Sequence, residues 1–150
     1  MTKHLKEDKK ALKSMIILFK AHNALIEYIK KDIEKTSFDL NEFAVFEVIY
    51  HKERLTVNEI KEKVLVANSS LTYILDKLEK KEYIKREADK NDKRIKHISL
   101  TDKGLTKALD VFPKHYDNLK EIFNTLSEEE CKSLNQSLKK IGYLAKERTK

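Results

Sequence analysis

Hydroxyl, amide and ammonium side chains gather at the start of a short apolar segment, residues 68–81. Apolar residues recur at helical spacing from Leu71 to Leu78, which predicts one amphipathic helix with Asn68 as its N-cap. Its polar face is either ordinary helix surface or a DNA-reading surface, because hydroxyl groups can serve both phosphates and base edges. We favour DNA contact through the residues Asn68, Ser69, Ser70, Thr72, Tyr73 and Lys77.

A basic hairpin is predicted directly after this helix. Residues 83–88 and 94–100 favour β-strands, and the polar run 89–93 between them favours a turn. An amphipathic helix followed by a basic hairpin is typical of a winged helix-turn-helix on DNA. Arg94 suits a narrow minor groove, although it could also be a solvated arginine. The remaining candidate cations, each a phosphate contact or a solvated charge, are Arg86, Lys90, Lys93 and Lys96.

Other chemistry finds little support. We see no nucleophile motif, glycine-rich phosphate loop or embedded carboxylate pair, so we expect no enzyme. The single Cys131 excludes an internal disulfide and, on an apolar stripe, is expected to be an inert thiol rather than a redox sensor. The five histidines lack metal-ligand spacing, and no cofactor is expected. Aromatic and histidine residues on the first two helices are candidates for a ligand pocket, namely Phe19, His22, Phe46, Tyr50 and His51. The alternative is that each histidine is partly buried and hydrogen-bonded to a neighbouring residue.

The elements that position these groups are helical. A long helix is expected over residues 6–35, then shorter helices over 40–51 and 57–64, with residues 52–55 as a connector. Asp39 with Glu42, and Thr56 with Glu59, have the spacing of capping boxes. The helix over 57–64 and the one after Asn68 together predict a helix-turn-helix whose second helix is the reader.

Two further long helices follow the hairpin, one capped by Thr101 and one by the pair Ser127 and Glu130. The apolar faces of the terminal helices are broader than one small DNA-binding domain can cover, which predicts a homodimer. The expected fold is mainly α, a winged helix-turn-helix with a two-stranded wing. Residues 1–36 and 113–150 form the dimerisation region, and residues 37–112 form the DNA-binding domain with its linking helix.

The overall charge agrees with a polyanionic partner. The chain of 150 residues has a net charge of +7, and its hydrophobic fraction of 40% suffices for a folded core. An acidic membrane surface is the rival partner, but no helix pairs a broad basic face with Trp and Phe. The N-terminal segment lacks the apolar core of a signal peptide, and no apolar run approaches a membrane span, so we expect a cytoplasmic protein.

The segment Asp92-Lys93-Arg94-Ile95-Lys96-His97-Ile98-Ser99-Leu100-Thr101-Asp102-Lys103-Gly104 resembles the wing signature of MarR-type transcriptional regulators. The order of elements is similar over nearly the whole chain, and segments such as Asp76-Lys77-Leu78-Glu79-Lys80-Lys81 look most like the quinone-responsive MhqR-like branch. The resemblance implies that Arg94 enters the minor groove and that Asp92 pairs with it. One departure is Glu82, where family members often have glycine.

The resemblance implies a dimer on a pseudo-palindromic operator. We therefore expect a sequence-specific regulator, a repressor released by a small aromatic, quinone-like ligand, with double-stranded DNA and a second copy of the chain as partners. Two alternatives remain open. A non-specific architectural DNA binder would bind random duplex equally well, and a helical protein-interaction module would show no salt-dependent DNA binding.

Overall fold

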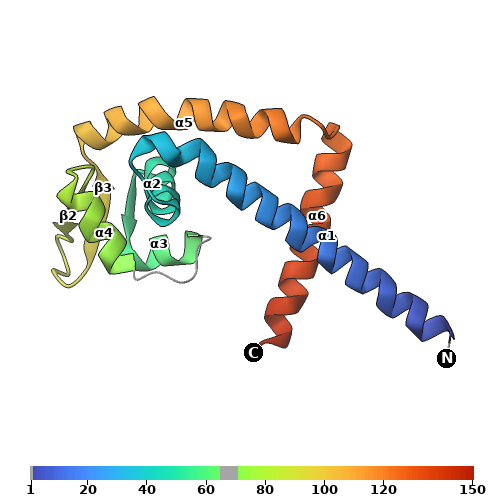
Figure 1. Ribbon diagram of the computed structural model, residues 1–150. Coiled ribbons are helices and arrows are strands. Elements are labelled where there is room, and N and C mark those ends of the chain that lie inside the picture. Colours follow the sequence, from blue (N-terminus) through green and yellow to red (C-terminus); the bar gives the residue numbers. More distant parts are fainter. Residues whose placement is uncertain (1, 65–70) are drawn as a thin grey trace. The chain divides into compact units, whose positions relative to one another are not determined.

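The computed structural model describes residues 2–64 and 71–150, with side chains from residue 9 onward. The chain divides into two compact units, Met1–Val111 and Phe112–Lys150. In chain order (Figure 1), the elements are α1 (Thr2–Ile33), η1 (Glu34–Thr36), α2 (Leu40–Lys52), β1 (Arg54–Thr56), α3 (Val57–Lys63), α4 (Leu71–Lys80), β2 (Ile84–Ala88), β3 (Lys96–Leu100), α5 (Asp102–Phe123) and α6 (Glu128–Arg148). The mainly helical winged-helix fold predicted from the sequence is confirmed.

The predicted capping boxes set where two helices of the first unit begin. Asp39 accepts a hydrogen bond from the Glu42 N–H, and the Glu42 carboxylate accepts one from the Asp39 N–H. Thr56 and Glu59 make the same reciprocal pair at the start of α3. Each box satisfies donors that a helix N-terminus otherwise leaves without a partner, so α2 and α3 start at defined residues.

The sheet has three antiparallel strands in the order β1-β3-β2, where the sequence predicted a two-stranded wing. The segment 52–55, expected to be a plain connector, contributes Arg54 and Leu55 to β1, and Leu55 pairs with Ile98 of β3. Leu55 is buried, and the short strand supplies backbone partners along the second edge of β3. A strand of three residues is too short for a period-two pattern to show it.

The core of this unit forms around α2, which packs against α3, α4 and β3. The aromatic rings of Phe38, Phe46 and Tyr83 lie within 5.8 Å of one another, centroid to centroid. The predicted stripe of α4 faces this core, since Ile74, Leu75 and Leu78 are all buried. Burial of this stripe therefore decides which face of α4 remains outside.

The end of α4 is set by a residue in a left-handed conformation. Glu82 has φ 61°, at the position where the MarR-type regulators that the sequence resembles often have glycine. Its N–H donates to the Glu79 carbonyl, and the Tyr83 N–H donates to the Leu78 carbonyl. This pair of bonds is a Schellman motif, which turns the chain from the helix into β2. The conformation costs Glu82 about 1 kcal/mol relative to glycine.

The second unit contains the C-terminal part of α5 and the whole of α6. Ser127 and Glu130 form the third predicted capping box at the start of α6. The large apolar side chains of α6 are exposed, including Leu138, Ile141 and Leu144. Over the described part of the chain, no helix has the length and apolar character needed to cross a membrane.

Candidate nucleic-acid interface

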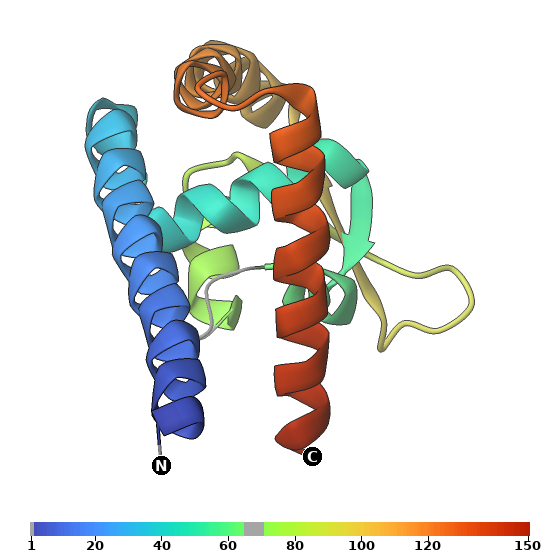
Figure 2. The ribbon, with the colours of Figure 1, turned by 90° about the vertical axis from the view of Figure 1, so that its right-hand side faces the viewer.

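The loop between β2 and β3 extends away from the helices of the first unit (Figures 1 and 2). Arg94 lies in this loop with 91% of its side chain exposed. Its Nε and a terminal nitrogen donate to the two oxygens of Asp92 at 3.0 and 2.9 Å. The hydrogen bonds from Arg94 hold the pKa of Asp92 below its ordinary value. The guanidinium is thus oriented by one carboxylate while its outer face is open to a polyanion.

A second carboxylate, Asp89, closes the base of the loop. Its Oδ2 lies 2.9 Å from Nε2 of His97, and its Oδ1 accepts the N–H groups of Asn91 and Asp92. These bonds, that of His97 first, lower the pKa of Asp89 to about 2. Asp89 is therefore ionised at any pH at which the protein works, and it fixes the turn that presents Arg94. Sequence reasoning assigned no role in the wing to Asp89 or His97.

The recognition helix α4 presents part of its predicted polar face. Thr72 and Tyr73 are exposed, and the Lys77 ammonium lies 5.6 Å from the centre of the Tyr73 ring. The predicted contacts Asn68, Ser69 and Ser70, including the N-cap, lie outside the described residues. Lys90, Lys93 and Lys96 are exposed along the hairpin, so three further exposed cations lie on the wing together with Arg94.

Besides Arg94, two of the predicted contact cations already have acidic partners in the protein. Arg86, on β2, lies 2.6 Å from Asp76 and 3.3 Å from Glu79, both on α4. Lys77 pairs with Asp39 at 2.9 Å, a contact that raises its pKa. Partial burial alone would raise the pKa of Asp39, but the Glu42 N–H and Lys77 lower it. Both cations therefore join α4 to neighbouring elements.

The candidate pocket residues lie in different surroundings in the first unit. Phe46 is fully buried in the aromatic core, so a ligand reaches its ring only if core side chains move. Phe19 and His22 are exposed on α1, whereas Tyr50 is half-buried and its ring lies 5.4 Å from that of His51. His51 lines a surface hollow of about 490 Å³ together with Val48, Lys52 and Lys63.

Cys131, expected to be an inert thiol on the apolar stripe of the last helix, is half-buried in the single chain. It lines a hollow of about 550 Å³ at the corner between α5 and α6, within the second unit. At this corner, one side of α6 is not covered by other residues. An apolar stripe in a sequence does not show which of its residues remain uncovered. Among the described residues, no group of three or more His, Cys, Asp or Glu side chains could hold a metal ion.

Comparison with known proteins places these features in a family. Residues 38–96 match the model of the MarR family. The chain is also 38% identical to the HTH-type transcriptional regulator MhqR of Bacillus subtilis (strain 168), over 92% of this chain and 95% of MhqR. The chain belongs to the MarR family. It is therefore a DNA-binding transcriptional regulator and not an enzyme, and the resemblance to MhqR predicted from the sequence is confirmed.

Solved structures of the MarR type share the fold. AbfR of Staphylococcus epidermidis superposes with a TM-score of 0.76 at 22% identity, covering 95% of this chain and 98% of AbfR. Reduced AbfR has been solved bound to DNA, and that structure superposes with a TM-score of 0.72 at 20% identity, covering both chains completely. NadR in complex with 4-hydroxyphenylacetate has a TM-score of 0.72 at 21% identity and covers 84% of this chain and 89% of NadR.

In this MarR-family chain, the residues that sequence reasoning missed are those whose partners lie on another element of the structure. Glu42 was recognised as a helix cap, but its ion pair with Lys81 spans 39 residues. Asp89 and His97 were seen as separate polar residues, because the β2–β3 register that joins them follows from strand pairing. The wing signature itself offered a signal, since His97 lies within it.

Proposed function

We propose that the chain is a sequence-specific repressor that binds its operator as a homodimer and is released by a small aromatic ligand. The observation that carries the DNA-binding site is Arg94, exposed on the wing and oriented by Asp92. Arg94 enters the minor groove, where negative potential is concentrated, while α4 lies in the adjacent major groove. Two groups of residues contact DNA directly. The first comes from the segment 68–81 and comprises Asn68, Ser69, Ser70, Thr72 and Tyr73. The second comes from the wing and comprises Lys90, Lys93, Arg94 and Lys96.

The dimer forms through residues 1–36 and 113–150. Apolar side chains are exposed along α1, among them Leu12, Ile16 and Phe19, and along α6, among them Leu138 and Ile141. So many exposed apolar residues on two long helices are typical of a helical interface, since burying them removes apolar area from water. Two-fold symmetry then places the DNA-binding domains of the two copies at successive major grooves about 34–36 Å apart.

The effector is a small aromatic, quinone-like compound. NadR was crystallised with the aromatic acid 4-hydroxyphenylacetate, which supports this ligand class in the MarR fold. In this chain Phe19, His22, Tyr50 and His51 supply rings and hydrogen-bonding nitrogens on α1 and α2, and Phe46 joins them if the core opens. Such a ligand releases DNA only by binding the DNA-incompetent state more tightly.

Selection of bound sequences from a random duplex pool tests the DNA-binding proposal. The expected result is a pseudo-palindromic sequence whose half-sites are one helical turn apart, with binding that weakens as salt rises. Equal binding of all sequences would indicate an architectural DNA binder instead. No salt-dependent binding would indicate a protein-interaction module, and either result would overturn the repressor assignment.

The effector is tested with the selected duplex, a series of benzoquinones and hydroquinones, and the Cys131→Ser variant. We expect release from both wild type and the variant, because the proposed site is non-covalent and lies on α1 and α2. Release from wild type alone would make the thiol the sensor. No release from either protein would exclude quinone-like compounds as effectors and leave the DNA-binding proposal standing.

A further inference from the structure

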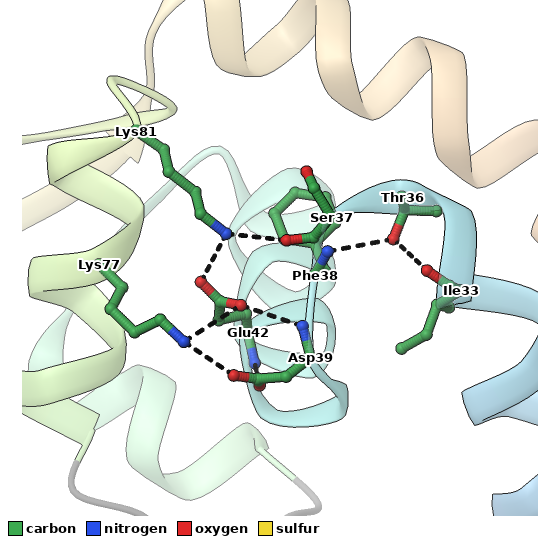
Figure 3. Close-up of polar contacts among 8 residues, drawn as sticks. All are labelled: Ile33, Thr36, Ser37, Phe38, Asp39, Glu42, Lys77 and Lys81. Atoms are coloured by element: carbon green, nitrogen blue, oxygen red, sulfur yellow. Dashed lines mark hydrogen bonds and ion pairs between the residues drawn. The ribbon is translucent and has the colours of Figure 1, made fainter.

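Four charged side chains join the start of α2 to the recognition helix (Figure 3). Asp39 and Glu42 come from the capping box of α2, Lys77 comes from α4, and Lys81 directly follows α4. Lys77 Nζ lies 2.9 Å from Asp39 Oδ2 and 3.4 Å from Glu42 Oε2, and Lys81 Nζ lies 2.8 Å from Glu42 Oε1. We call these four residues the α2–α4 clamp.

Glu42 is the centre of the clamp, because it is the buried member. Its side chain is 2% exposed, whereas those of Lys77 and Lys81 are 32% and 31% exposed. One carboxylate oxygen meets Lys81, and the other accepts the Asp39 N–H and lies near Lys77. A buried carboxylate without cations is strongly disfavoured, so the charge of Glu42 holds α4 where both lysines reach it.

The clamp also reaches the end of α1. Lys81 donates to the Ser37 carbonyl at 2.9 Å, and its ammonium lies 5.2 Å from the centre of the Phe38 ring. The Phe38 N–H donates to Thr36, whose hydroxyl donates to the Ile33 carbonyl at the last residue of α1 (Figure 3). Any displacement of α4 relative to the α1–α2 junction must therefore break or rearrange the contacts of Lys81 with Ser37 and Phe38.

We propose that Glu42 is a positioning residue for operator recognition, fixing the angle and depth of α4 through Lys77 and Lys81. Lys77 then acts on DNA binding through the clamp and not as a phosphate contact. The inference rests on the proposed function, in which α4 reads the operator. It adds a buried acidic residue to the determinants of specificity, at a position that touches no DNA.

Glu42 either positions α4 or has no role in recognition. The two possibilities can be distinguished, because they predict opposite changes in operator affinity when the charge of Glu42 is removed. A carboxylate close to a DNA-binding surface repels phosphates. If Glu42 does not position α4, removing its charge should therefore strengthen binding to every duplex. Neutralising a positioning residue should weaken binding to the operator alone, because only specific binding depends on where α4 lies in the groove.

The test is Glu42→Gln in the full-length protein, since glutamine can still accept at a capping box but carries no charge. Affinity is measured on the selected operator and on a random duplex of equal length, over a range of salt concentrations. We expect operator affinity to fall roughly tenfold, about the worth of one base contact, with random-duplex affinity unchanged or higher. The matched control is Glu59→Gln, the same change at the equivalent capping-box position of α3, where the glutamate is exposed and bonded only within its own box. The control should not lower operator affinity, and any gain should be equal on the operator and on the random duplex.

Lys77→Gln provides a second variant that does not bury an unpaired amide in the core. If Lys77 contacts a phosphate, its loss weakens all duplexes and reduces the slope of log affinity against log salt by about 1. As a clamp residue, its loss weakens the operator selectively and leaves that slope unchanged. The double variant Glu42→Gln/Lys77→Gln should lose less than the sum of the single losses, because both changes break one interaction.

Two results would overturn the inference: a folded Glu42→Gln protein that binds the operator as well as wild type or better, or a reduced salt slope in Lys77→Gln. If Glu42→Gln does not fold by circular dichroism, Lys77→Gln decides alone. A wild-type protein that prefers no sequence would overturn the proposed function itself, so the two failures are distinguishable.

Discussion

Individual charged residues in the first unit are assigned to different tasks by their partners. Arg94 pairs with a carboxylate two positions away in the same loop, which orients it but leaves it exposed. Arg86 pairs across elements with Asp76 and Glu79, and it therefore braces β2 against α4. An arginine whose partner lies in the same loop thus remains available for DNA recognition, whereas an arginine whose partners lie on another element stabilises the fold.

Arg94→Ala is expected to weaken operator binding by about five- to 150-fold while leaving the fold intact, because the side chain is exposed and makes no contact with the core. Gel-shift titration with circular dichroism measures both effects. Arg148→Ala, which removes an exposed arginine from the last turn of α6, is the matched control. Equal losses in the two variants would mean that net charge, and not the wing contact, sets the affinity.

Asp89 should give the wing a defined pH dependence. Its folded pKa of about 2 lies below the ordinary value, so its stabilising contribution is complete above about pH 4 and is lost as the pH falls through about 2. The amide protons of Asn91 and Asp92 report it directly, because both donate to Asp89. NMR titration should show their shifts unchanged near pH 4 in wild type, while a midpoint close to 4 would contradict the bonded geometry. In Asp89→Asn this acid-dependent step should be absent.

At the scale of elements, the first turn of α5 is packed against the turn that ends α4. Thr101 donates its hydroxyl to the Glu82 carbonyl and accepts the Gly104 N–H, which confirms it as the predicted cap. A Cβ built on Gly104 would lie 1.9 Å from the Tyr83 carbonyl oxygen. The glycine of the wing signature is thus required for close approach of two elements, since no larger residue fits between them.

Gly104→Ala is expected to lower the free energy of unfolding by about 1–3 kcal/mol, because the backbone of Tyr83 must move to admit a methyl group. The chain offers a matched control in Gly142, inside α6, where an added Cβ meets nothing within 4 Å. Gly142→Ala should raise the stability by about 0.5–1 kcal/mol through helix propensity. Urea denaturation compares the two, and similar changes in both variants would refute the packing argument.

At the scale of the whole molecule, the exposed apolar residues of α1 and α6 are the surface that we propose to form the dimer. Leu134, Leu138 and Ile141 follow one another at helical spacing on α6 and are all exposed in the single chain. The described structure buries none of the α6 side chains. A stripe of this kind on an otherwise highly charged helix points to assembly with a second copy.

Sedimentation at micromolar concentration should therefore show a dimer rather than the 17.7 kDa monomer. Leu138→Asp should dissociate it or unfold the terminal helices, because the new charge would be buried without a partner at the interface. Gln136→Asp introduces the same charge two positions away, outside the stripe, and should leave the dimer intact. A wild-type monomer, or dissociation by both variants, would exclude this interface.

The sequence by itself determined the helices, the starts of α2, α3, α5 and α6, and the hairpin of the wing, because these depend on local chemistry. Three capping boxes, the stripe of α4 and the strained Glu82 could all be read from residues a few positions apart. The family signature likewise lies within 13 consecutive residues, from Asp92 to Gly104.

Only the tertiary structure decided which charges are free to meet DNA. The pairing of Lys77 and Lys81 with Glu42, of Arg86 with Asp76, and of β1 with β3 joins residues from 10 to more than 40 positions apart. No periodicity encodes such contacts, because they arise when helices and strands pack and buried charges must find partners. A lysine on a helix surface therefore looks the same in sequence whether it meets a phosphate or a buried glutamate.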